Sequence, residues 1–155
     1  MQLNDLLKKE NIKIPLEARE RDFAIKELIG LMDGQINDSE LAFNAVLERE
    51  KIMTTGVGNG IAIPHCKHQS CPDFTVALGV AETEIDFASI DNKKVKLVFV
   101  LLGPENSPAI HIKLLSRISR LMSNEQIRDQ LLSCATAEEA FQLIKSEEEN
   151  FPEIE

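Results

Sequence analysis

The chain has 155 residues, of which 26 are acidic and 17 are Lys or Arg, so its net charge is −9. This length predicts one domain with its own core, and 43% hydrophobic with 28% charged residues is typical of a globular rather than a disordered protein. The acidic balance and the lack of Trp and Tyr argue against a nucleic-acid groove, and no apolar run approaches the roughly 18 residues of a membrane span.

The first third of the chain carries two patterns that are typical of helices. Between residues 20 and 32, apolar residues recur at helical spacing, and Gly34 provides a stop signal. Asp38 or Ser39 can cap a second helix, whose end we expect near residues 48–50.

The middle of the chain favours strands. A glycine-rich loop over residues 56–60 leads into a short apolar run over residues 61–63, which Pro64 ends because it lacks an N–H. Two longer β-rich runs follow, at residues 74–81 and 95–102. Both contain few charges, so we expect both to be buried strands.

The last third favours helices. Ser107 can cap a helix whose first position is Pro108, the favoured place for proline. Ser123 and Thr136 are each followed three residues later by Gln or Glu, which is the capping-box spacing, so two more helices are expected there. Strands in the middle with helices before and after predict an α/β or α+β sandwich, in which helices cover both faces of a sheet.

The two ends of the chain indicate where the domain begins and ends. The N-terminus and the cysteines indicate the cellular compartment. We expect one domain over residues 1–150 and a solvated acidic tail over residues 151–155. The N-terminus has neither the basic nor the apolar stretch of a secretory leader, and Cys66, Cys71 and Cys134 lack the spacing of a disulfide framework. A cytoplasmic protein is therefore expected.

His65 is the first candidate for chemistry. It follows Pro64 at the exit of the short apolar run, where a stiff backbone aims the side chain near solvent. The preceding loop allows close backbone approach to an anion, so its candidate phosphate-binding residues are Gly56, Gly58, Asn59 and Gly60. The loop matches neither the Walker A pattern nor GxGxxG, and a plain turn is the simpler interpretation of the glycines.

His111 and Arg49 are the other candidates. His111 falls in the first turn of the helix that begins at Pro108, beside unpaired N–H groups that favour phosphate. A buried histidine that donates to a backbone carbonyl is the alternative. Arg49 lies at the expected end of a helix, where it either pairs with a neighbouring glutamate or turns toward the glycine loop to neutralise an oxyanion.

Two rival sites use the cysteines near His65. His65, Cys66, His68 and Cys71 are all zinc-ligand types, but adjacent residues point in opposite directions on an extended chain and no CxxC pair is present. A structural zinc module built on His65, His68 and Cys71 stays open as an alternative. Cys66 as a nucleophile with His65 or His111 as its base would make a thiol enzyme, although no acyl-transfer signature surrounds it.

The segment EKIMTTGVGNGIAIPHC, residues 50–66, resembles the active-site signature of the fructose, mannitol and nitrogen class of enzyme IIA. These are phosphocarrier domains of the bacterial phosphoenolpyruvate-dependent phosphotransferase system. An Arg precedes the signature at Arg49, a second histidine follows it at His111, and looser similarity extends over nearly the whole chain. Cys66 departs from the pattern, because glycine is commoner after the Pro-His pair, which puts access to the site in question.

The resemblance implies a mixed sheet between helices and a role for each candidate residue. His65 would accept a phosphoryl group from the phosphohistidine of the carrier HPr. Arg49 and His111 would hold the phosphoryl oxygens, and loop N–H groups and a protonated His111 would be suitable donors. No cofactor or metal is implied, because transfer between histidines needs neither.

Two functional classes follow from the resemblance. In the first, the chain is a nitrogen-type regulatory protein whose phosphorylation state decides which kinase, transporter or enzyme it binds. In the second, it is a fructose- or mannitol-type IIA that relays phosphate to a IIB domain for sugar uptake. No IIB, IIC or HPr segment is present in the sequence, which favours the regulatory class.

Overall fold

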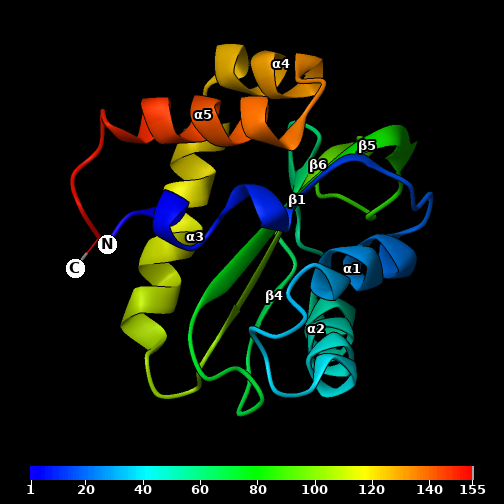
Figure 1. Ribbon diagram of the computed structural model, residues 1–155. Coiled ribbons are helices and arrows are strands. Elements are labelled where there is room, and N and C mark those ends of the chain that lie inside the picture. The colour runs from blue at the N-terminus through cyan, green and yellow to red at the C-terminus, as the bar shows by residue number, and fades with distance from the viewer. Residues whose placement is uncertain (155) are drawn as a thin grey trace.

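The computed structural model describes residues 1–154 and consists of a mixed β-sheet between two groups of helices (Figure 1). The strands of the sheet are β1 (Ile12–Leu16), β2 (Gly56–Gly58), β3 (Ile61–Ala62), β4 (His65–Lys67), β5 (Thr75–Ile85) and β6 (Val95–Gly103). The helices are α1 (Arg21–Gly30), α2 (Ser39–Ile52), α3 (Pro108–Met122), α4 (Glu125–Ser133) and α5 (Ala137–Glu148), with short 3-10 turns at Leu3–Asp5 and Lys9–Asn11.

The sheet combines parallel and antiparallel pairs. Its order is β1-β5-β6-β3-β2, and β4 also pairs with β6 beyond the end of β3. β1 is parallel to β5, β5 is antiparallel to β6, and both β3 and β4 are parallel to β6. The expected mixed sheet is therefore confirmed.

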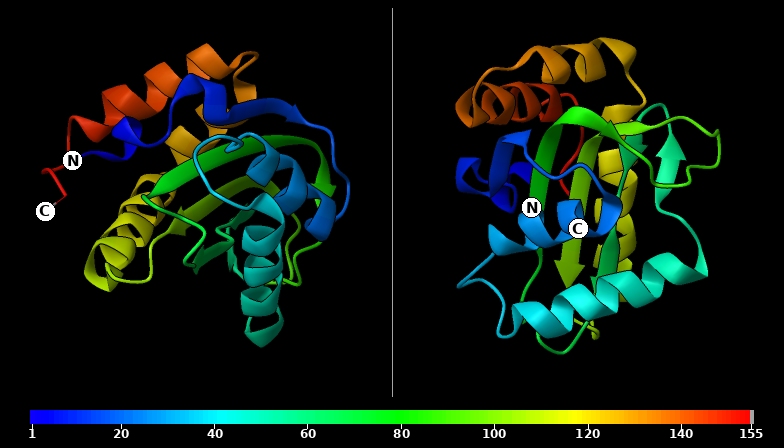
Figure 2. Two further views of the ribbon diagram at one scale, coloured as in Figure 1. Left: turned by 60° about the horizontal axis from the view of Figure 1, so that its bottom comes forward. Right: turned by 90° about the vertical axis from the view of Figure 1, so that its right-hand side faces the viewer.

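Each face of the sheet forms its own core. Along β6, Leu97, Phe99 and Leu101 face one core, and Val98 and Val100 face the other, as the two-residue period of a strand requires. α3, α4 and α5 cover the first face, and α1 and α2 cover the second (Figure 2). The expectation that helices cover both faces is confirmed.

Helix boundaries follow side-chain capping, with three departures from expectation. Asp38 caps α2 through a hydrogen bond from the Leu41 N–H, but the helix continues to Ile52 rather than ending at residues 48–50. α4 is capped by Asn124 instead of Ser123, because the Asn124 carboxamide oxygen reaches the N–H groups of the first turn. Ser107 precedes α3 without a side-chain capping bond.

The end of the chain does not lie free in solvent. Ile154 is buried, and its N–H donates to the Met1 carbonyl. The Arg117 guanidinium donates to the Pro152 carbonyl and lies over the Phe151 ring. Within the expected tail, Pro152 and Glu153 are exposed whereas Ile154 is buried, and Glu155 lies outside the described residues. Within residues 1–154, no helix is long and apolar enough to cross a membrane.

Candidate functional site

β4 holds His65 at one end of the sheet. The strand runs parallel to β6, with His65 beside Leu101. Its side chains alternate, so that His65 and Lys67 share one face while Cys66 is buried in the opposite core. The apolar run before Pro64 thus delivers the His65 ring, half-buried, to the α3 side of the sheet.

A backbone carbonyl fixes the tautomer of His65. The Nδ1 atom of His65 lies 2.7 Å from the Ile63 carbonyl oxygen, which can only accept a hydrogen bond. Nδ1 therefore carries the proton, and Nε2 keeps its lone pair. Burial lowers the pKa of His65 below its usual 6.5, and the positive charges of Arg49 and Lys67 lower it further, against the hydrogen bond to Ile63 and the Glu50 charge. The ring is neutral at pH 7.

His111 faces His65 from the first turn of α3. Their ring centroids are 5.6 Å apart, and the Phe74 ring lies 6.3 Å from that of His111. His111 is buried, yet neither of its ring nitrogens has a hydrogen-bond partner within residues 1–154. The alternative of a core histidine that donates to a carbonyl is therefore wrong.

Burial, with the nearby His65 and Lys67, lowers the pKa of His111 to about 4. The expectation of a protonated His111 is wrong for this state of the protein. A neutral imidazole still offers one N–H, because only one of its two nitrogens keeps a lone pair. The structure thus places an unsatisfied donor and an unsatisfied acceptor beside His65.

Arg49 lies in the last turn of α2, half-buried, and its guanidinium donates to the Met53 carbonyl at 3.0 Å. Within residues 1–154 Arg49 forms no ion pair with Glu48 or Glu50, and its positive charge lowers the pKa of His65. Glu50 secures this turn, because its buried carboxylate accepts hydrogen bonds from the N–H and hydroxyl of Thr55, at 2.8 and 2.6 Å.

Lys67 is a residue that sequence reasoning missed. It follows His65 by two positions in β4, and its positive charge lowers the pKa of both His65 and His111. Within residues 1–154 its ammonium forms no ion pair. The period of two in an extended segment was the signal that could have identified it.

The turn of the glycine loop lies away from His65 along the sheet. β2 and β3 form a hairpin whose turn contains Gly58, Asn59 and Gly60, all with positive φ. β3 pairs Ile61 with Leu97, four residues before Leu101 on β6, so the turn and His65 are more than about 13 Å apart along the sheet.

The loop N–H groups also have other partners. The Asn59 N–H donates to the Asp91 carboxylate, and the Gly56 N–H donates to the Thr54 hydroxyl. In this structure the N–H groups of Gly56 and Asn59 are therefore already occupied, and residues 58–60 form the turn of the β2–β3 hairpin.

The structure also removes the two cysteine alternatives. Within residues 1–154, no three His, Cys, Asp or Glu side chains lie close enough together to hold a metal ion, and His68 Nδ1 instead bonds to Ser70. Cys66 points away from the histidines into the α2 core, where burial raises the pKa of its thiol to about 12. A thiol this weakly acidic is not a nucleophile at neutral pH.

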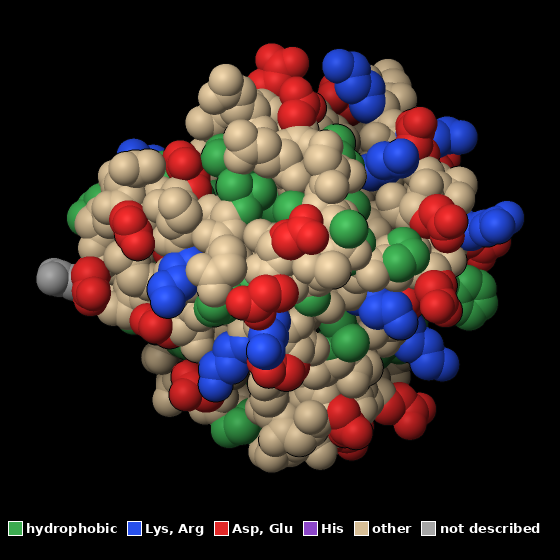
Figure 3. Space-filling model, turned by 45° about the horizontal axis from the view of Figure 1, so that its top comes forward, with side chains coloured by type: hydrophobic (Ala, Val, Ile, Leu, Met, Phe, Trp, Pro, Cys, Tyr) green, Lys and Arg blue, Asp and Glu red, His purple; other side chains and the backbone are tan. Residues whose placement is uncertain are grey.

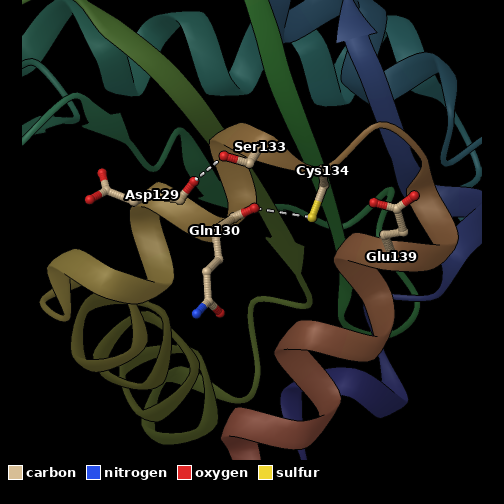
Figure 4. A pocket seen from close by; sticks show the side chains of 5 residues that line it. All are labelled: Asp129, Gln130, Ser133, Cys134 and Glu139. Atoms are coloured by element: carbon tan, nitrogen blue, oxygen red, sulfur yellow. Dashed lines mark hydrogen bonds between the residues drawn. The ribbon is translucent and has the colours of Figure 1, made fainter.

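Cys134 lies far along the chain in a shallow hollow of about 350 Å³ between α4 and α5 (Figure 4). Its thiol donates to the Gln130 carbonyl at 3.3 Å, and burial and Glu139 raise its pKa. Figure 4 shows Asp129 pointing away from the sulfur, whereas the Glu139 carboxylate lies on the side of Cys134, where it accepts a hydrogen bond from the Ala135 N–H. The hollow contains no activated nucleophile.

Sequence comparisons agree with this arrangement. The family described as "Phosphoenolpyruvate-dependent sugar phosphotransferase system, EIIA 2" matches residues 5–147. The fructose-specific EIIABC component of Bacillus subtilis is 35% identical over 146 residues, which are 93% of this chain but 23% of that protein. The nitrogen regulatory protein of Bradyrhizobium diazoefficiens is 34% identical over 145 residues, covering 93% of this chain and 95% of that protein.

Solved structures share the fold. The crystal structure of the nitrogen regulatory protein IIA-Ntr from Neisseria meningitidis superposes with a TM-score of 0.86 at 29% identity, over 92% of this chain and 98% of that one. The mannitol IIA of Escherichia coli, solved in complex with phosphorylated IIB, gives 0.78 at 21% identity, over 91% and 99% of the chains. With the family match over residues 5–147, these findings show that the chain belongs to the EIIA type 2 family of the phosphoenolpyruvate-dependent sugar phosphotransferase system.

Proposed function

We propose that the protein is a phosphocarrier that accepts a phosphoryl group on Nε2 of His65. The observation that carries this proposal is the 2.7 Å contact between His65 Nδ1 and the Ile63 carbonyl. It leaves the lone pair of Nε2 available on a ring that is neutral at pH 7. Membership of the EIIA family supports a phosphohistidine intermediate.

The transfer step balances without a metal or a redox partner. The P–N bond of the donor phosphohistidine breaks, and its electron pair returns to the donor nitrogen. The Nε2 lone pair of His65 forms the new N–P bond, while Nδ1 keeps its proton and the bond to Ile63. The loose transition state of phosphoryl transfer requires positioning and charge stabilisation, which a fixed ring and nearby cations provide.

Three side chains and the start of α3 are suited to the phosphoryl oxygens. Arg49 and Lys67 supply positive charge near His65. His111 supplies a ring N–H that has no other partner within the described residues, 1–154. The first N–H groups of α3 add donors at the positive end of that helix.

The nitrogen-type regulatory role is the finer proposal. It is supported by the 34% identical nitrogen regulatory protein, of which this chain covers 95%, and by the 0.86 TM-score to IIA-Ntr. We propose an HPr-type carrier as donor and a regulated kinase or transporter as target, all in the cytoplasm. The fructose-type relay to a IIB domain is the second candidate, favoured by the 35% identity to the Bacillus subtilis EIIABC component.

Phosphorylation of the purified chain tests the acceptor. Incubation with phosphoenolpyruvate, enzyme I and HPr is expected to add one acid-labile phosphate. His65→Ala is expected to abolish this addition, whereas His68→Ala is the matched control, because its ring bonds to Ser70 away from the site. Full phosphorylation of the His65→Ala variant would overturn the proposal.

The two roles predict different fates of the phosphate. A regulatory protein is expected to retain it in the presence of a purified fructose-type IIB domain and to bind its target in only one phosphorylation state. A sugar-specific IIA is expected to lose it to IIB within seconds. Rapid transfer to IIB would exclude the regulatory proposal in favour of the relay.

A further inference from the structure

A second polar hollow lies at the end of the sheet away from His65. It has a volume of about 430 Å³ and is lined by Asn59, Gly60, Glu84, Lys93, Lys94 and Arg128. An adjoining space of about 230 Å³ shares most of these residues and adds Lys96, Glu125 and Asp129. The signature hairpin turn, which the histidine site does not use, thus forms one wall of a separate site.

The hollow gathers positive charge in an acidic protein. Three of its six lining residues are cationic and one is acidic, although the whole chain carries −9. Within residues 1–154, Lys93, Lys94 and Arg128 have no carboxylate within ion-pair distance. Cations that lack an ion-pair partner and face one space favour an anionic ligand, because the ligand replaces only water and breaks no existing ion pair.

Arg128 is the fixed member of this group. It is half-buried in α4, and its Nη1 donates to the Met122 carbonyl at 2.8 Å, at the end of α3. One donor face of the planar guanidinium is held by this bond, and the remaining N–H groups are free to bind a phosphate. Figure 1 shows α3 running from the lower edge of the molecule, where it begins, up to α4.

The turn gives the opposite wall a fixed shape. The Gly60 carbonyl accepts hydrogen bonds from the N–H groups of Lys96 and Leu97, at 3.0 and 3.1 Å. The Asn59 N–H is held by Asp91, and the Asn59 carboxamide has no partner within residues 1–154. Both the carboxamide of Asn59 and the carboxylate of Glu84 are left to accept hydrogen bonds from a ligand.

We propose that this hollow binds a small organic phosphate that carries hydroxyl groups, such as a sugar phosphate. Lys93, Lys94 and Arg128 take the phosphate, and Glu84 and Asn59 accept hydrogen bonds from the hydroxyls. The volume suits a ligand of this size. The site is distinct from His65 and does not depend on its phosphorylation.

Titration followed by NMR tests the proposal, in the His65→Ala variant so that the histidine site does not accept phosphate. Pyrophosphate and glucose 6-phosphate are expected to shift the amides of Asn59, Gly60 and Arg128 in a saturable manner. Lys94→Gln combined with Arg128→Gln is expected to weaken both ligands at least tenfold. Lys51→Gln is the matched control, because Lys51 pairs with Glu48 on α2, outside the hollow.

A second variant separates the phosphate from the hydroxyl contacts. Glu84→Gln is expected to weaken glucose 6-phosphate relative to pyrophosphate, because it replaces one acceptor oxygen for hydroxyls with an NH2 donor and removes a charge that repels anions. Shifts confined to His111 and its neighbours, shifts that do not saturate, or equal binding by the double variant would overturn the site. In the parent chain, which keeps His65, the same double substitution is expected to leave phosphorylation unchanged, and its loss would contradict the separation of the two sites.

Discussion

His65 and His111 carry the same ring but are held by different means. His65 has a backbone acceptor for one nitrogen, which fixes its tautomer. His111 has no partner for either nitrogen within residues 1–154, and burial keeps it neutral until a charged group arrives. A phosphoryl dianion beside it would raise its pKa, because an opposite charge favours the protonated ring. The pair is thus suited to one acceptor and one responsive donor.

Removing a nearby cation is expected to raise the pKa of His65. Arg49 and Lys67 both disfavour its protonated form, so Arg49→Met and Lys67→Met each move the pKa back toward 6.5. NMR titration of the ring protons measures the change. Lys94→Met at the far hollow is the control and leaves the pKa unchanged. An unchanged value in both site variants would show that these charges do not reach the ring.

His111 is expected to make folding sensitive to acid. Its pKa is about 4 in the folded chain and near 6.5 when unfolded, so the unfolded chain binds the proton first as pH falls. Above pH 6.5, His111 is neutral in both the folded and the unfolded chain, so it does not change the free energy of unfolding with pH. Between pH 6.5 and pH 4, this free energy falls progressively as the unfolded chain takes up the proton. Between pH 7 and about pH 4.5, His111→Leu is expected to lose less free energy of unfolding than the parent, by on the order of 2 kcal/mol. Urea unfolding at both pH values measures this, and an identical loss in both proteins would contradict it.

At the scale of elements, the geometry of the β2–β3 hairpin requires glycine at three of its positions. A Cβ on Gly56 would lie 2.2 Å from the Ser89 hydroxyl oxygen, so the loop over Ser89 excludes any side chain there. Gly58 and Gly60 have φ values of 103° and 77°, which other residues rarely adopt. These are structural requirements of the hairpin and do not depend on a bound phosphate.

Gly56→Ala is therefore expected to destabilise the protein, by about 1–3 kcal/mol, as overpacking does. Ser89→Gly in the same chain is expected to restore much of the loss, because it removes the clashing atoms. Gly30→Ala in α1 is the matched control. Nothing lies within 4 Å of a Cβ at Gly30, so this change is expected to be neutral or stabilising. Thermal unfolding measures all three, and a tolerated Gly56→Ala would contradict the close approach.

Sequence patterns predicted the strands that are buried along most of their length. They failed for features that depend on contacts with residues far away in the sequence. The run at residues 74–81 matches the first part of β5, which begins at Thr75, and the run at residues 95–102 lies within β6. Both were recognisable because a strand buried on both faces has an apolar sequence. β1 was missed, since Lys13 and Pro15 interrupt its pattern and only pairing with β5 makes it a strand. The roles of N–H groups in the glycine loop depended on Asp91, far along the chain, which no local pattern indicates.

At the scale of the whole molecule, one buried ion pair joins segments from both ends of the chain. Arg117 of α3 and Glu148 of α5 are 2.7 Å apart and almost fully buried. The Glu148 carboxylate also accepts hydrogen bonds from the Leu3 and Asn4 N–H groups, while Arg117 reaches Gln2. Figure 1 shows the first and last described segments side by side near α3 and α5. The acidic tail composition gave no sign of this packing.

Glu148→Gln is expected to cost about 3 kcal/mol, because it leaves the Arg117 guanidinium buried without its counter-charge. Residues 2–7 are expected to exchange their amide hydrogens faster, since Glu148 holds that segment. Glu149→Gln, exposed one position further along, is the control and is expected to change stability little. Hydrogen exchange and urea unfolding measure both effects. Unchanged exchange in Glu148→Gln would contradict the role of this pair.

Neither sign of charge dominates the face that carries α4 and α5. Figure 3 shows acidic and basic side chains interspersed there, and no histidine is visible on it. The histidine site and the second hollow are each formed by side chains from several elements. Sequence-wide net charge predicted neither, because both depend on which side chains the fold brings together.

The contact between His65 and the Ile63 carbonyl spans three residues of one segment, with Pro64 between them. Because the ring and its acceptor belong to the same short stretch, no distant element must move for the lone pair to be presented. In the proposed role of His65, the ring would need little reorganisation when phosphate arrives and little when it leaves, so by microscopic reversibility the return of phosphate to the donor would be catalysed equally well. The relative concentrations and energies of donor and acceptor would then set the direction of net flow.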